Sequence, residues 1–287
     1  MKTKNKKIGI AVIHGMGDQP EEFSESFIQD IVSYYDEGDG GFDSRELHFE
    51  SVYWADILNG QESELWENLD LGNLHFDKYR KFIVNYFGDA VAYQKMYDLK
   101  KARSRNDLTV YYKVQNKISA SLERISRNTE KGSPLVLIGH SLGCVMLMNY
   151  IYDSQKSPER KKAGNWKSKC EPDFLAGLFT CGNPFALWSL RKENFGDVIC
   201  FPGKKLTAEI AEISAWYNIY DPDDILAFPI KHLNESYRNS QKLTDLQVDV
   251  DEILLGHTPL SHLGYFTTLS IIKLISNFLR ELRTALK

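Results

Sequence analysis

One stretch constrains the fold more than any other: a short apolar run, a turn that contains two glycines, and a second apolar pattern. Residues 135–138 read Leu-Val-Leu-Ile, Gly139 and Gly143 flank Ser141, and the second pattern covers residues 142–152. A short continuous apolar run bounded by turn residues is typical of a buried strand, and the second pattern has the length of a helix. The sequence therefore predicts strand, sharp turn and helix in direct succession.

The turn itself suggests a chemical role for Ser141. Gly139-His140-Ser141-Leu142-Gly143 has the pattern Gly-x-Ser-x-Gly. Glycines on both sides leave room where the backbone reverses, so the serine can adopt strained dihedral angles and expose its hydroxyl at the end of the strand. Such a serine is a candidate nucleophile. A glycine-rich turn that carries an incidental serine is the alternative interpretation of the pattern alone.

The rest of the chain alternates strands and helices. Residues 8–13 are wholly apolar and rich in branched side chains, as expected of a central parallel strand. Further strands are expected at residues 47–54, 174–180, 215–220 and 246–250. Helical spacing of apolar residues begins after Pro20, recurs between Tyr111 and Ile125, and closes the chain over residues 263–286. This alternation predicts an α/β fold: a doubly wound, mostly parallel sheet with helices on both faces and a site at the carboxyl ends of its strands.

Residues 57–105, approximately, interrupt this alternation with many aromatic side chains. Apolar positions between Tyr79 and Met96 recur at intervals of three and four, so at least one helix is expected there. Because no linker or repeat divides the chain, we expect one domain, residues 1–287, that carries this segment as a helical insertion, cap or lid. Its aromatic residues could line an apolar pocket, although aromatic stripes at helical spacing usually belong to the core.

Charge and cysteine content narrow the class of protein. A formal net charge of −4 provides no basic field that would attract nucleic acid. The four cysteines show no Cys-x-x-Cys spacing, which favours reduced thiols over a disulfide framework or a zinc site. The apolar run after the basic residues 1–7 is too short for a signal peptide or a membrane span. These features favour a cytoplasmic protein.

A nucleophilic serine in such a sheet needs a base and an acid, which follow it in the order serine, acid, histidine. Three histidines lie after the acidic residues 221–224. His262 is the first choice because it precedes the closing helix, where it would lie over the carboxyl edge of the sheet. His257 is the reserve, and His232 is less suitable because it precedes the last expected strand. A metal site of His257 and His262 is not indicated, since their spacing does not share a helical face and no acidic ligand adjoins them.

Two aspartates compete for the role of the acid. Asp224 is the first choice, because Ile225 and Leu226 can anchor the loop and leave the carboxylate facing the histidine. Asp221 is the reserve, since an aspartate directly before Pro222 is also a common turn residue. The carboxylate would hold the imidazole in the tautomer that accepts the serine proton.

Two backbone N–H groups are candidates for an oxyanion hole. Leu142 directly follows the serine, and its N–H is the first expected donor. The second is the N–H of Met16 in the loop His14-Gly15-Met16-Gly17, where two glycines let the backbone approach a substrate. An ordinary strand-to-helix turn is the alternative interpretation of this loop when it is considered alone.

Taken together, these motifs resemble the α/β-hydrolases, in particular the lipase and esterase-like serine hydrolases. The matching pieces are Val12-Ile13-His14-Gly15-Met16-Gly17, Gly139-His140-Ser141-Leu142-Gly143, Thr180-Cys181-Gly182-Asn183-Pro184, Asp224-Ile225-Leu226 and Ser261-His262. Cys181 and Asn183 stand where such enzymes often have other residues.

The resemblance implies hydrolysis of a carboxylic ester through an acyl-enzyme, with no cofactor. The expected substrate is a small-molecule ester or a lipid-like one. A thioesterase, an amidase or an acyltransferase would use the same residues, and a non-catalytic binding protein on the same fold is a further alternative. Action at a membrane surface would need an exposed apolar patch, which the aromatic segment could supply. The oligomeric state does not follow from the sequence.

Overall fold

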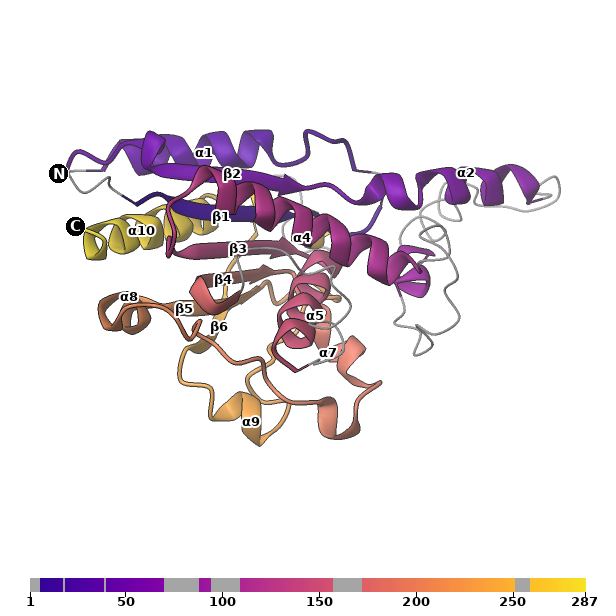
Figure 1. Ribbon diagram of the computed structural model, residues 1–287. Helices are drawn as coiled ribbons and strands as arrows, with labels where there is room; N and C mark the ends of the chain where they lie inside the picture. The colour runs from indigo at the N-terminus through magenta and orange to yellow at the C-terminus, as the bar shows by residue number, and fades with distance from the viewer. Residues whose placement is uncertain are drawn as a thin grey trace.

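A six-stranded, wholly parallel sheet runs through the computed structural model of the protein (Figure 1). The structure describes residues 6–17, 19–38, 40–69, 88–93, 109–156, 172–250 and 259–287. Its strands are β1 (Ile8–Ile13), β2 (Leu47–Val52), β3 (Leu135–His140), β4 (Leu175–Cys181), β5 (Ala215–Tyr220) and β6 (Leu243–Gln247). They lie in the order β2-β1-β3-β4-β5-β6. The predicted α/β architecture with a parallel sheet is confirmed.

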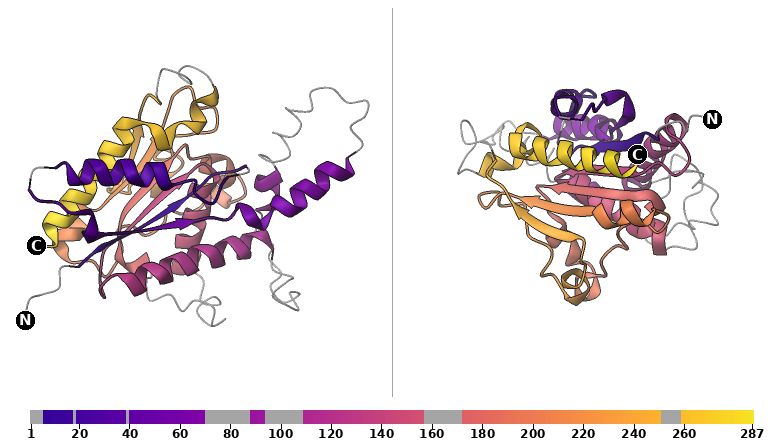
Figure 2. Two further views of the ribbon diagram at one scale, coloured as in Figure 1. Left: turned by 90° about the horizontal axis from the view of Figure 1, so that it is seen from above. Right: turned by 90° about the vertical axis from the view of Figure 1, so that its left-hand side faces the viewer.

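Helices cover both faces of this sheet. The helices α1 (Glu25–Asp36) and α10 (Leu269–Ala285) lie on one face, and α4 (Val110–Asn128) and α5 (Leu142–Lys156) lie on the other (Figure 2). Successive residues of a strand point to opposite faces. Accordingly, Ile10 and Val12 pack in the core under α1 and α10, whereas Ala11 and Ile13 pack in the core under α4 and α5. An apolar strand such as β1 is therefore buried on both sides.

Shorter elements connect these layers. The helices among them are α2 (Asn59–Asn68), α7 (Phe185–Ser189), α8 (Ala208–Ile213) and α9 (Glu235–Arg238). The 3-10 turns are η1 (Ser44–Glu46), η2 (Ala55–Ile57), η4 (Pro172–Phe174), η5 (Glu193–Phe195), η6 (Pro259–Leu263) and η7 (Tyr265–Thr267). In Figure 1, α2 extends beyond the carboxyl ends of the strands.

The strand order creates a switch point between β1 and β3. From β1 the chain moves outward to β2, and it then returns across the sheet to β3 on the other side of β1. The helix that follows β1 lies on one face and the helix that follows β3 lies on the other. In open α/β sheets, ligands bind in the crevice at such a point, outside the carboxyl ends of the strands. The loop His14–Gly17 and the turn at Ser141 both lie there.

Several predicted elements have different bounds in the structure: the strand predicted at residues 47–54 ends at Val52, and the helix expected after Pro20 begins at Glu25. The last strand is Leu243–Gln247 rather than residues 246–250. Asp245 in its middle interrupts the apolar pattern of this strand, and its carboxylate accepts the N–H groups of Ile230 and Lys231. The closing helix begins at Leu269 instead of residue 263, because the two 3-10 turns η6 and η7 precede it. This difference matters, since His262 lies on the first of these turns.

Part of the predicted insertion can be compared with the structure. Of residues 57–105, the structure describes 57–69 and 88–93, which contain α2 and a helical turn at residues 88–92. The remainder, like His257, lies outside the described residues, and a cap or lid stays a prediction. Cys144, Cys181 and Cys200 are free thiols. Within the described ranges, no helix is both long enough and apolar enough to span a membrane.

Candidate active site

Ser141 lies at the tip of the turn between β3 and α5 in a backbone conformation that serine rarely adopts. Its φ angle is 53°, in the left-handed region where the side chain of a non-glycine residue crowds the backbone. Two hydrogen bonds hold the turn: the Ser141 N–H donates to the carbonyl of Cys181, and the Cys144 N–H donates to the carbonyl of Ser141, both at 2.9 Å. A strained residue persists only where its surroundings fix it, and such residues cluster at functional sites.

Two glycines bring the loop after β1 against this turn. A Cβ atom on Gly143 would lie 2.5 Å from the carbonyl oxygen of His14, and one on Gly15 would lie 2.6 Å from Cβ of Ser141. Neither distance is tolerable for carbon, so any other residue at these positions would separate the two segments. The loop that carries Met16 therefore lies directly beside the candidate nucleophile.

The three predicted side chains of the triad form a continuous chain of hydrogen bonds. His262 Nε2 lies 2.7 Å from Ser141 Oγ, and His262 Nδ1 lies 2.8 Å from Asp224 Oδ2. All three residues are at most 3% exposed. They come from three separate connections in the sheet: the turn after β3, the loop after β5 and the turn η6 after β6. The structure thus assembles Ser141, His262 and Asp224 in the predicted arrangement.

The positions of the protons follow from the charge on Asp224. Burial on its own raises the pKa of this carboxyl, but hydrogen bonds from His262, from the Leu226 N–H and from Tyr265 outweigh it, and the pKa lies below its usual value. An ionised carboxylate only accepts hydrogen bonds, so Nδ1 of His262 carries the proton in this pair. In a neutral imidazole, Nε2 is then the acceptor for the hydroxyl hydrogen of Ser141.

The reserve acid, Asp221, has a different task. Its Oδ1 accepts the N–H of Asp223 and its Oδ2 accepts the N–H of Val250, both at 2.7 Å. These bonds fasten the loop after β5 to the chain beyond β6. The carboxylate of Asp221 therefore shapes the loop, while Asp224 faces His262. The reserve histidine, His257, lies outside the described residues.

His14 fixes the orientation of the Met16 N–H. Nε2 of His14 accepts the N–H of Trp54 at 3.0 Å, so its Nδ1–H donates to the carbonyl of Gly15 at 2.8 Å. In a planar trans peptide the carbonyl and the next N–H point to opposite sides. With the Gly15 carbonyl turned toward His14, the Met16 N–H must face away from that ring. Burial holds the pKa of His14 at about 4, so this ring is a neutral support.

Both predicted oxyanion donors are available for a ligand. In the part of the chain that the structure describes, no hydrogen bond is donated by the N–H of Met16 or of Leu142. Leu142 is the first residue of α5, where an N–H has no partner within its own helix. The helix dipole adds partial positive charge at the same point. These groups can accommodate a negatively charged oxygen beside Ser141.

Three further residues support the site that were not identified from the sequence. The Asp89 carboxylate accepts the Gly17 N–H at 2.8 Å and so holds the end of the loop after β1. His140 donates from Nε2 to the carbonyl of His262 at 2.7 Å, and burial holds its pKa at about 3. Tyr265 donates to Asp224 at 2.8 Å. From the sequence, His140 is visible only as part of the glycine turn, and spacing alone does not connect Asp89 or Tyr265 with its partner.

A buried polar cluster anchors the loop that carries Asp224. Asn218 on β5 donates two hydrogen bonds from Nδ2, one to the carbonyl of Phe228 and one to the carboxylate of Asp245. Its Oδ1 accepts a hydrogen bond from Nδ2 of Asn183 at 2.9 Å. The Asn183 carbonyl accepts the N–H of Phe228 at 3.2 Å. Buried networks of this kind rigidify a structure when their members are satisfied. Asn183 is therefore a support of the acid loop.

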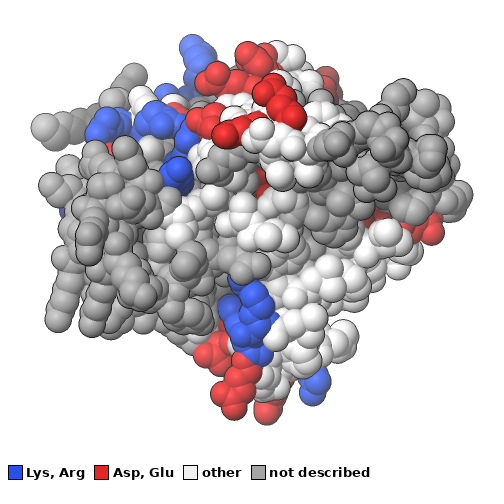
Figure 3. Space-filling view, turned by 90° about the vertical axis from the view of Figure 1, so that its right-hand side faces the viewer, with Lys and Arg blue, Asp and Glu red and all other residues white. Residues whose placement is uncertain are grey.

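Apolar side chains stand beside the buried triad at the surface. Ile225 is 68% exposed and Leu263 is 55% exposed, each directly after a triad residue. On the face toward which the strands point, much of the described surface in the middle is uncharged, and charged residues gather above and below it (Figure 3). Ile225 and Leu263 thus present exposed apolar area on the two loops that carry Asp224 and His262.

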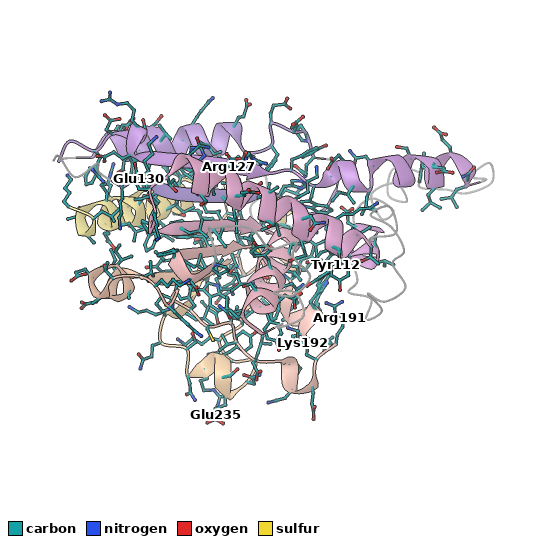
Figure 4. All side chains as sticks on the ribbon, in the orientation of Figure 1. Tyr112, Arg127, Glu130, Arg191, Lys192 and Glu235 are labelled. Carbon is teal, nitrogen blue, oxygen red and sulfur yellow. The ribbon has the colours of Figure 1, made fainter. Side chains whose placement is uncertain are left out.

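A separate cavity of about 710 Å³ lies beside the C-terminal half of α5. Its lining includes Tyr111, Asn149 and Asp153, together with Arg191 and Lys192, which Figure 4 shows below the N-terminal end of α4. Ser141 is not part of this lining. Among the described residues, no three His, Cys, Asp or Glu side chains gather where they could hold a metal ion.

Comparisons with known proteins do not decide between functions. No protein-family model, no curated protein and no solved structure matches this chain. What the chain does must therefore be inferred from the geometry at the carboxyl ends of β1, β3 and β5.

Proposed function

We propose that the protein is a serine hydrolase of the α/β-hydrolase type, which cleaves a carboxylic ester through an acyl-enzyme. One observation carries the proposal: the hydrogen-bond chain from Ser141 through His262 to Asp224 begins at a serine held at positive φ. The order serine, aspartate, histidine along the chain supports it, as does the strand-turn-helix setting of the serine. The same three groups act together in unrelated serine hydrolases, where geometry identifies them better than sequence position.

Acylation begins with Ser141 Oγ attacking the ester carbonyl while His262 Nε2 takes the hydroxyl proton. The carbonyl oxygen becomes an oxyanion and accepts hydrogen bonds from the N–H groups of Met16 and Leu142. The tetrahedral intermediate then collapses, the bond between carbon and the alcohol oxygen breaks, and His262 returns its proton to the leaving alcohol. Asp224 orients the imidazole and stabilises its positive charge throughout.

Deacylation repeats these steps with water. His262 Nε2 takes a proton from a water molecule, whose oxygen attacks the acyl carbon. When the second tetrahedral intermediate collapses, the bond to Ser141 Oγ breaks and His262 gives the proton back to the serine. The products are a carboxylic acid and the regenerated enzyme.

The apolar side chains beside the triad favour a substrate with an apolar acyl group. Ile225 and Leu263 expose most of their side-chain area next to Asp224 and His262. Burying apolar area contributes roughly 25 cal/mol per Å², so a longer acyl chain that covers these residues gains affinity. A lipid-like ester fits this surface, and a membrane surface is a further candidate partner. A thioester, an amide or an acyl acceptor other than water would use the same machinery.

A non-catalytic binding protein is a weaker alternative. Proteins that keep a hydrolase fold without activity need no serine at strained dihedral angles, no neutral imidazole and no ionised carboxylate in line. Here Ser141, His262 and Asp224 are all present and joined through His262 in one chain of hydrogen bonds. The positive φ of Ser141 costs free energy, and a purely structural turn could avoid that cost with a glycine at this position.

A fluorophosphonate probe tests the proposal directly. We expect the probe to label the wild-type protein and the Ser154→Ala variant, which removes a serine hydroxyl from α5, but not the Ser141→Ala variant. A panel of esters of increasing acyl length, together with co-sedimentation with liposomes, then separates soluble short-chain, soluble long-chain and membrane-bound substrates. The proposal is wrong if folded wild-type protein is neither labelled nor active, or if Ser141→Ala is labelled fully.

A further inference from the structure

The hydroxyl of Tyr265 contacts the same carboxylate oxygen as the candidate catalytic histidine. Tyr265 opens the turn η7, three residues after His262, and is fully buried. Its hydroxyl oxygen lies 2.8 Å from Asp224 Oδ2, and His262 Nδ1 lies 2.8 Å from that atom as well. Two donors from one short segment thus converge on a single oxygen of the acid.

The direction of the tyrosine hydrogen bond is fixed by a second contact. The backbone N–H of Asp221 lies 2.9 Å from the Tyr265 hydroxyl oxygen. Because a backbone N–H can only donate, the phenol oxygen is the acceptor in that bond. Its own hydrogen is then directed to Asp224. Burial, with the neighbouring Asp224 charge, raises the pKa of Tyr265 well above its usual value, so the phenol keeps this hydrogen.

The carboxylate of Asp224 is therefore held by three donors on its two oxygens. The Leu226 N–H binds Oδ1 at 2.9 Å, and the remaining two bind Oδ2. A hydrogen bond to the ionised form of an acid favours that form and draws charge toward the donor. The bond from Tyr265 thus orients the carboxylate and also reduces the negative charge that faces His262.

We propose that Tyr265 is a positioning residue of the active site, which sets through Asp224 how strongly the histidine is held and how readily it becomes protonated. This inference rests on the proposed function for its catalytic meaning, whereas its effect on His262 can be measured without turnover. The alternative is that Tyr265 only fills space: its ring lies where a Cβ on Gly182 would approach it to 2.8 Å.

Other groups near His262 do not replace this role. On β3, the His140 ring lies 5.1 Å from the His262 ring, and burial keeps it neutral. On the turn after β3, Ser141 is an uncharged hydroxyl. Behind them, burial raises the pKa of Cys144 and Cys181, so both remain thiols. Asp221 is the other nearby carboxylate, and its two oxygens bind backbone N–H groups.

The first test is Tyr265→Phe, with Tyr237→Phe as the matched control of a buried tyrosine on α9. We expect Tyr265→Phe to lower kcat/KM by roughly tenfold, as for the loss of a hydrogen bond to a charged group. The acid limb of its pH–rate profile should move to higher pH by about half a unit, since Asp224 then concentrates more charge on His262. In an Asp224→Asn background, Tyr265→Phe should have no further effect.

A second variant should shift the acid limb in the opposite direction, and it tests the role of Tyr265 even if Tyr265→Phe does not fold. Incorporation of 3-fluorotyrosine at position 265 retains the ring and makes the hydroxyl a stronger donor, so the acid limb should move to lower pH. The NMR titration of the His262 ring should show the same two opposite displacements, even if the wild-type protein hydrolyses no ester. A wild-type protein that hydrolyses no ester would refute the proposed function but not the effect of Tyr265 on His262. Unchanged titration of His262 in the fluorinated protein, or an equal loss with and without Asp224, would overturn the role of Tyr265.

Discussion

Acidification should destabilise this protein through two histidines at the site, His14 and His140. Both rings lie in buried surroundings. His14 accepts the N–H of Trp54, which requires a neutral imidazole, and His140 donates to the carbonyl of His262. Although part of His140 is exposed, its ring lies against three other rings, at centroid distances of 5.1 to 5.8 Å. A charge on either ring would be poorly solvated.

The magnitude follows from the two pKa values. Burial lowers the pKa of His14 from 6.5 to about 4 and that of His140 to about 3. As the pH falls below 6.5, the unfolded chain binds protons that the folded protein does not, so stability is lost progressively from 6.5 down toward these lower values. At pH 5 each ring lowers the free energy of unfolding by about 2 kcal/mol relative to neutral pH, and the two together by about 4 kcal/mol. The total free energy of unfolding of a typical domain is only about 5–15 kcal/mol.

Urea titrations at pH 7, 6 and 5, followed by tryptophan fluorescence, measure this loss. His14→Gln removes one titrating ring while it retains a donor and an acceptor, so about half of the loss should disappear, whatever the stability of the variant at pH 7. His232→Gln, in a surface turn after β5, is the control and should keep the wild-type loss. A free energy of unfolding that stays constant between pH 7 and pH 5 would refute the idea that burial keeps these rings neutral.

Three further outcomes are expected. Asp224→Asn should lower kcat by about 10⁴-fold, because the amide no longer holds the imidazole in the tautomer that accepts the serine proton. The rate of hydrolysis of a sensitive ester substrate measures this loss. Gly15→Ala should abolish labelling by the fluorophosphonate, since its Cβ would lie 2.6 Å from Cβ of the nucleophile, whereas Gly60→Ala, with nothing within 4 Å, should retain it. Arg283→Ala should destabilise the fold by about 3 kcal/mol in urea denaturation, because it removes a buried guanidinium and leaves its half-buried partner, Glu46, without a counter-charge. Arg127→Ala, at an exposed pair on α4 (Figure 4), should cost at most about 1 kcal/mol.

The sheet could be predicted where burial on both faces leaves a continuous apolar run. The strands β1 and β3 are such runs, and their predicted bounds agree with the structure to within two residues. The strand β6 is different, because it lies at the edge and carries Asp245, which accepts N–H groups from a loop 14 and 15 residues earlier. Those N–H donors satisfy the carboxylate within the strand, but the residues around Asp245 in the sequence do not predict them.

The candidate site also contains residues that the sequence predicts and others that it does not. Ser141, Asp224 and His262 each follow a strand, so chain order and parallel pairing suffice to bring them to one edge. Tyr265 lies in a stretch whose apolar spacing suggested a continuous helix, and the two 3-10 turns there aim its hydroxyl at Asp224. Its role depends on the direction of a side chain, and hydrophobic periodicity does not encode that direction.

The three imidazoles of the site explain why its acid sensitivity and its proposed chemistry belong together. A proton that leaves Ser141 during the proposed attack needs a basic nitrogen in hydrogen-bond contact with the serine hydroxyl. His14 and His140 are held neutral by burial and already use their nitrogens to orient Met16 and the turn of His262. His262 alone combines contact with Ser141 and an ionised partner, Asp224, that stabilises an imidazolium. Burial of the other two rings thus directs the proton to His262, and the same burial makes the fold lose stability in acid.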